Sequence, residues 1–70
     1  MDINKTMQTW YGLYTVYGIP FVDDAIALYE GGWRSSDREL LKREYNLDEE
    51  TADAYILVFR RIEEDEKNAE

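Results

Sequence analysis

Apolar residues recur three or four positions apart from residue 3 to residue 17, the spacing of one face of a helix. Gly18 is a suitable stop for such a helix. The pattern therefore predicts a first helix over 3–17. A strand over 10–17 is the open alternative, because this stretch is rich in aromatic and β-branched side chains, and because Gly12 would cost about 1 kcal/mol inside a helix.

A second helix is predicted to follow the turn at 18–20, since proline fits the first turn of a helix. Gly31 and Gly32 are expected to end it. Asp23 and Asp24 are expected in its first turn, where the helix dipole favours negative charge. The residues of its apolar stripe are Val22, Ala25, Ile26 and Tyr29.

A third, shorter helix is predicted over about 37–45. Ser36 and Glu39 have the S-x-x-E form of a capping box, in which two helix-end amide groups are satisfied reciprocally. The apolar residues that this helix offers for burial are Leu40, Leu41 and Tyr45.

The last helix has the clearest pattern. Residues 46–48 break the chain, Asp48 is a good N-cap, and the helix is expected to fray within 63–70. Its apolar stripe consists of Ala52, Tyr55, Ile56, Phe59 and Ile62, and is widened by Leu57 and Val58. We therefore predict a single all-α domain over 1–70, a compact bundle of three or four helices with a helical hairpin in its C-terminal half.

The composition favours a folded protein without catalytic chemistry. The 70 residues are 44% hydrophobic and 14% aromatic, which is too apolar for a disordered chain even with a net charge of −8. Cysteine and histidine are both absent from the sequence, which removes thiolate nucleophiles, ordinary zinc sites and the usual general base. We expect a non-enzymatic protein without cofactor or metal. We also expect it to be cytoplasmic, because no segment resembles a signal peptide or a membrane span.

Negative charge is concentrated toward the C-terminus. Residues 1–22 are neutral, whereas residues 48–70 carry nine acidic and three basic residues, a net charge of −6. The predicted hairpin resembles a helix-turn-helix, yet its second helix begins with acidic residues that would repel phosphates. Direct binding of nucleic acid is therefore not expected.

The same acids suggest that the domain imitates nucleic acid and covers a basic surface of a protein that handles DNA or RNA. Glu49 and Asp53, four residues apart on a helix, place two carboxylates about 5–6 Å apart. The simpler alternative is a solvated acidic surface that only keeps the protein soluble. The candidate partner-binding residues are Asp23, Asp24, Glu30, Trp33, Asp48, Glu49, Glu50 and Asp53.

Ten aromatic residues are more than a domain of this size is expected to bury completely. Five lie on the apolar stripes and are expected in the core, namely Trp10, Tyr14, Tyr29, Tyr55 and Phe59. Tyr11, Trp33 and Tyr45 lie off the stripes or near connections, and such residue types are enriched in interfaces. They support a second hypothesis, a helical adaptor or dimerisation module whose acidity serves only solubility.

Residues 17–34 and 41–54 together resemble small acidic proteins of phages and prophages of Gram-positive bacteria. Short acidic phage proteins of this kind include inhibitors of host nucleic-acid machinery, among them anti-CRISPR proteins. The resemblance implies an inhibitor of that class. Because it rests on size and charge and contains no functional motif, it assigns no site residue.

Overall fold

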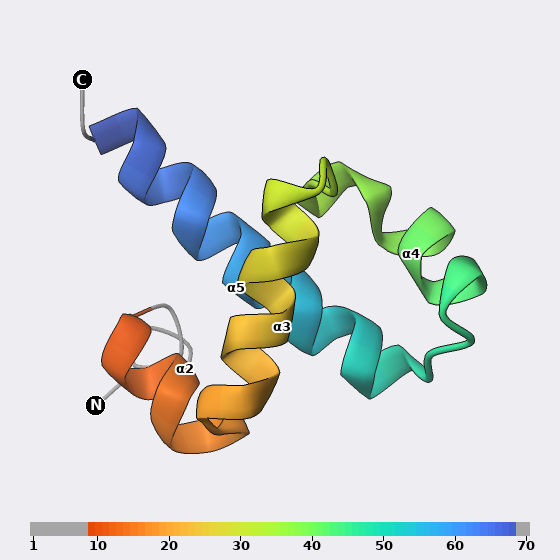
Figure 1. The fold of residues 1–70 in the computed structure, drawn as a ribbon, viewed down its shortest axis with the longest axis horizontal. Helices are drawn as coiled ribbons and strands as arrows, with labels where there is room; N and C mark the ends of the chain where they lie inside the picture. Colours follow the sequence, from red (N-terminus) through yellow and green to blue (C-terminus); the bar gives the residue numbers. More distant parts are fainter. Residues whose placement is uncertain (1–8, 69–70) are drawn as a thin grey trace.

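The computed structural model describes residues 9–68, and every regular element in this part of the chain is helical. The elements are α2 (Trp10–Tyr17), α3 (Ile19–Glu30), the 3-10 turn η1 (Ser35–Asp37), α4 (Arg38–Glu44) and α5 (Glu49–Asn68) (Figure 1). The predicted all-α bundle is confirmed. The strand alternative for residues 10–17 is wrong, because this segment is α2.

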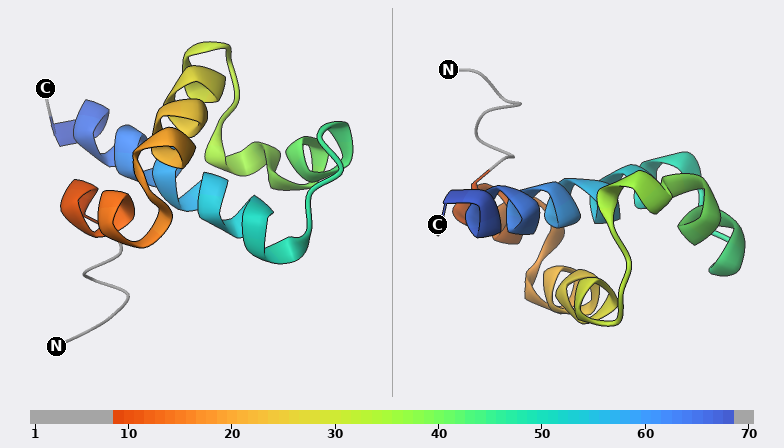
Figure 2. Two further views of the ribbon diagram at one scale, coloured as in Figure 1. Left: turned by 60° about the horizontal axis from the view of Figure 1, so that its bottom comes forward. Right: turned by 90° about the horizontal axis from the view of Figure 1, so that it is seen from above.

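The long helix α5 contacts α2, α3 and α4. α2 packs beside α5, α4 lies along its N-terminal half as the predicted helical hairpin, and α3 crosses α5 (Figure 1). Seen from above, α2, α4 and α5 lie in one layer and α3 forms a second layer against it (Figure 2). All four helices meet in one core, whose fully buried large side chains are Leu13, Val22, Leu41, Val58 and Phe59.

The buried residues of α5 agree in most positions with its predicted apolar stripe. Ala52, Ile56 and Phe59 are buried as expected, whereas Tyr55 and Ile62 are only half-buried. Val58, which widens the predicted stripe, is fully buried. The buried face is broader than a single stripe because α5 contacts α2, α3 and α4 from different sides.

Gly18 joins α2 to α3 as predicted. Its φ of 88° lies in the region that favours glycine, and its N–H donates to the carbonyl of Tyr14 at 2.9 Å. α3 then begins at Ile19, so its first turn contains no acidic residue. The prediction that Asp23 and Asp24 occupy the first turn is wrong, and their exposure to water, rather than the helix dipole, accommodates their charge.

The beginning of α2 differs from the predicted start at residue 3. Thr9 is extended and acts as the N-cap, since its hydroxyl accepts from the N–H of Gly12 at 3.0 Å. The helix therefore begins at Trp10. Residues 3–8 of the predicted helix lie outside the described residues.

The predicted capping box of Ser36 and Glu39 is wrong. Ser36 lies inside η1, and the carboxylate of Asp37 accepts from the N–H of Arg34 at 3.0 Å, so the capping interaction occurs two residues earlier. The N-cap of α4 is Asp37. Within the 3-10 turn, the N–H of Asp37 donates to the carbonyl of Arg34 at 3.0 Å.

α4 buries less than predicted. Leu41 is fully buried, whereas Leu40 and Tyr45 are 50% and 51% exposed. The helix has only about two turns and packs with one edge on α5, so a single position faces the core. α4 ends at Glu44 and is followed by Asn46, whose φ is 52°, and the N–H of Leu47 donates to the carbonyl of Lys42 at 2.9 Å, as in a Schellman motif.

Candidate functional site

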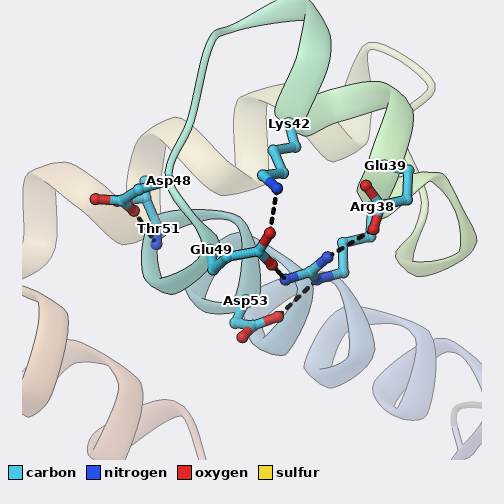
Figure 3. Close-up of polar contacts among 7 residues, drawn as sticks. All are labelled: Arg38, Glu39, Lys42, Asp48, Glu49, Thr51 and Asp53. Atoms are coloured by element: carbon cyan, nitrogen blue, oxygen red, sulfur yellow. Dashed lines mark hydrogen bonds and ion pairs between the residues drawn. The ribbon is translucent and has the colours of Figure 1, made fainter.

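An ion-pair cluster joins α4 to the beginning of α5 (Figure 3). The guanidinium of Arg38 contacts Glu39 at 2.9 Å, Asp53 at 2.6 Å and Glu49, and the ammonium of Lys42 contacts Glu49. The predicted spacing of Glu49 and Asp53 on one helix face is correct. That face lies against α4, where Arg38 and Lys42 are also four residues apart.

The cluster neutralises two of the predicted partner-binding acids. Hydrogen bonds from Arg38 and Lys42 lower the pKa of the Glu49 carboxyl to about 2. Hydrogen bonds to Asp53 and Glu49 raise the pKa of the Arg38 guanidinium. Because both acids already hold cations of their own chain, Glu49 and Asp53 have less negative charge to offer a partner.

Asp48 has a structural role. Its side chain accepts from the N–H of Thr51 at 2.7 Å, which confirms the predicted N-cap of α5 (Figure 3). Hydrogen bonding from Thr51 lowers the pKa of the Asp48 carboxyl.

We predict that the domain loses stability as the pH falls from about 5 toward 2. The pKa of Glu49 is about 2 in the folded chain against an ordinary value of 4.5, so its stabilising contribution is complete above 4.5 and is lost on acidification. Thermal midpoints measured against pH should fall in this range. Glu49→Gln should flatten the curve, and Glu50→Gln, at a neighbouring exposed position, should leave it steep. Equal slopes for both variants would contradict the assignment.

The acids of the C-terminal half of α5 tie other elements to this helix. Glu63 accepts from the N–H and the hydroxyl of Ser35 at 3.0 and 2.7 Å. Asp65 accepts from the indole of Trp10, and Glu66 accepts from the hydroxyl of Tyr29. Sequence reasoning treated these acids only as part of the charged pool. The available signal was that indole and phenol groups at a core edge need hydrogen-bond partners.

All seven predicted partner-binding acids are exposed, and four of them take no part in the contacts described above: Asp23, Asp24, Glu30 and Glu50. None of them makes a hydrogen bond or an ion pair to another side chain in the part of the chain described. Asp23 and Glu30 are seven residues apart on α3, with the exposed Ala27 between them, so they lie on the same outer face. Among the predicted partner-binding acids, those without such a contact therefore lie on α3 and in the first turn of α5.

Three aromatic rings from three helices form an aromatic cluster, defined as Tyr17, Phe21 and Tyr55. Phe21 stacks on Tyr55 with ring centroids 4.5 Å apart, and Tyr17 lies 5.4 Å from Phe21. All three side chains are half-buried. This cluster could not be predicted from the spacing of residues along the chain, because the three rings come together only when α2, α3 and α5 pack.

Acidic residues surround this aromatic cluster. Burial raises the pKa of the Tyr17 hydroxyl, and the negative charges of Asp53 and Glu50 raise it further. Burial likewise raises the pKa of Tyr55, with a further contribution from Asp24. Two of the exposed acids, Asp24 and Glu50, therefore lie close enough to these rings to influence them.

The turn at 31–34, which contains the candidate partner-binding residue Trp33, makes contacts within the domain. Trp33 is half-buried against the core, with its ring 6.0 Å from that of Tyr45. The guanidinium of Arg34 lies 3.9 Å from the ring centroid of Tyr29 and donates to the Tyr29 carbonyl at 2.8 Å. Trp33 thus has a packing role that the sequence did not distinguish from partner binding.

Within residues 9–68, no three acidic side chains are grouped so that they could hold a metal ion. None of the helices in this range is both long and apolar enough to span a membrane. The chain matches no protein-family profile, no curated protein and no solved structure.

Proposed function

We propose that this protein is a non-enzymatic inhibitor that binds a host nucleic-acid-handling protein and covers its basic surface. The observation that carries the proposal is the exposed carboxylates of Asp23, Asp24, Glu30 and Glu50, which have no ion-pair partner in the described chain. Binding through them breaks no internal contact of the domain.

The arrangement of these acids suits a basic cleft. Asp23 and Glu30 are about 10 Å apart along the axis of α3, at about 1.5 Å per residue, and Asp24 lies between them in sequence. These carboxylates place negative charges at intervals along a helix, much as the phosphates of a nucleic-acid strand are placed along its backbone. The net charge of −8 also steers the domain toward a basic partner and away from nucleic acid.

The proposal is tested by capture and competition. The immobilised domain is incubated with a lysate of a Gram-positive bacterium, the host class that the sequence resemblance indicates, at low and at high salt. We expect basic nucleic-acid-binding proteins to be retained at low salt and lost at high salt. A retained protein, once purified, should release labelled DNA when the domain is added. Retention that ignores salt and leaves DNA bound would contradict the proposal, as would direct binding of DNA to the domain.

An adaptor or dimerisation module is the second candidate function. It is favoured by exposed apolar side chains on α2 and at the start of α3, where Tyr11, Val16 and Ile19 are 81%, 55% and 62% exposed. Association through this surface should persist at high salt, because apolar contacts are not screened by ions. Sedimentation equilibrium at two salt concentrations separates the two functions: a salt-resistant dimer supports the module, and a monomer at both supports the inhibitor.

A further inference from the structure

The aromatic cluster and its neighbouring acids form a surface with two chemical properties. The stacked rings of Phe21 and Tyr55 present half-buried aromatic faces and edges. Asp24 follows Phe21 by three residues on α3, so the two side chains are neighbours on that helix. Glu50 approaches from the first turn of α5. The aromatic cluster therefore has one carboxylate beside it on α3 and a second on α5 whose charge acts on Tyr17.

We propose that this surface, formed by the aromatic cluster with Asp24 and Glu50, is the docking site for an arginine side chain of the basic partner. The inference rests on the proposed function and names the site and the chemistry of its central contact. The two features that the sequence presented as competing surfaces, acidic and aromatic, then act together in one site.

The domain itself contains an arginine held in this way. The guanidinium of Arg34 lies over the ring of Tyr29, whose hydroxyl donates to the carboxylate of Glu66. That site combines a cation, an aromatic ring and an acid. The aromatic cluster likewise combines rings with nearby acids, since the charges of Asp53 and Glu50 act on Tyr17 and that of Asp24 acts on Tyr55.

Two of the three basic side chains of α4 already hold acids of this chain. Arg38 holds Glu49 and Asp53, and Lys42 holds Glu49. Asp24 and Glu50 have no such partner in the described residues. The carboxylates of Asp24 and Glu50 are therefore available to bind a cation from outside the domain.

Arginine fits this surface better than lysine. Its planar guanidinium stacks on an aromatic face while its N–H groups remain directed at carboxylates, whereas the lysine ammonium is compact and strongly hydrated. At a partly exposed site a cation–π contact changes affinity by about two- to fivefold. At equal charge, an arginine ligand is therefore expected to bind about two- to fivefold more tightly than a lysine ligand.

The test uses two short peptides of equal length, one alternating arginine with glycine and the other alternating lysine with glycine. Each is titrated into the full chain while the ring-proton resonances of Tyr17, Phe21 and Tyr55 are followed by NMR. We expect tighter binding of the arginine peptide, by about two- to fivefold, with shifts at these rings. Equal affinities with unmoved ring resonances would overturn the inference.

Two variants and a charge-matched control locate the preference. Phe21→Leu removes the central ring and should abolish the arginine preference while leaving the charge unchanged. The double variant Asp24→Asn with Glu50→Gln should weaken arginine-peptide binding more than Glu44→Gln with Glu64→Gln, which removes the same charge from exposed positions elsewhere. Circular dichroism confirms that each variant is folded, and the surface pair provides the test if Phe21→Leu is not.

The outcomes separate this inference from the proposed function. Loss of the arginine preference in Phe21→Leu and in the double variant Asp24→Asn with Glu50→Gln supports the docking site. If the variants bind both peptides as the wild type does, the docking site is wrong, while competition with DNA for the captured protein still decides the inhibitor function. If the domain releases no DNA from any captured protein, the inhibitor function fails regardless of the peptide result.

Discussion

Phe59→Ala is expected to lower the free energy of unfolding by about 3–5 kcal/mol, the usual range for removing a buried aromatic ring. Phe59 is the largest fully buried side chain, and its ring lies 5.9 Å from that of Tyr29 across the α3–α5 contact. A small domain has only about 5 kcal/mol of stability to lose. We therefore expect most of the variant to be unfolded at 37 °C, as measured by circular dichroism during urea denaturation.

Arg60→Ala is the matched control for this prediction. Arg60 is the next residue on the same helix and is exposed. Its replacement should change the free energy of unfolding by no more than about 0.5 kcal/mol. Similar effects of the two substitutions would show that α5 does not bury the face that the structure assigns to it.

Leu41→Ala is expected to cost about 2–5 kcal/mol and to release α4 from the rest of the fold. Leu41 is the only buried residue of α4, and surface ion pairs contribute little, so its burial is expected to contribute most to holding this helix against the core. Amide hydrogen exchange should therefore accelerate throughout 38–44 while α3 and α5 keep more of their protection.

Leu40→Ala is the control at the adjacent position, which is 50% exposed. It should leave the exchange of α4 amides nearly unchanged. If Leu40→Ala destabilises α4 as much as Leu41→Ala does, the orientation of α4 on α5 is different from the one described. If Leu41→Ala leaves exchange unchanged, the ion pairs hold α4 more strongly than surface pairs usually do.

Local signals were sufficient to predict most helix positions. The turn at Gly18 and the N-cap at Asp48 each depend on residues close in sequence, and both are confirmed. The errors occurred where a short helix takes its orientation from its neighbours. α4 is too short for its own periodicity to decide whether Leu40 or Leu41 faces the core, and the 3-10 turn before it changed the capping residues.

The candidate site was less predictable than the fold because charge pairing is a tertiary property. The spacing of Glu49 and Asp53 could be derived from the sequence, but their neutralisation by Arg38 required the α4–α5 packing. The aromatic cluster likewise depends on three helices meeting. Asp23 and Asp24 are exposed, as expected of candidate partner-binding residues. Their predicted position in the first turn of the helix was wrong.

The most direct test of the central claim is a paired comparison of binding to the captured basic protein. Asp23→Asn with Asp24→Asn removes two charges from the α3 surface, and Glu44→Gln with Glu64→Gln removes two from other exposed positions, so both variants start from the same net charge of −8 and lose the same amount. We predict that the α3 variant loses at least about tenfold in affinity at low salt, or about 1.4 kcal/mol, and shows a shallower salt dependence, whereas the control stays close to the wild type. Equal losses in the two variants would contradict the claim, because they would show that net charge alone, and not the α3 surface, governs binding.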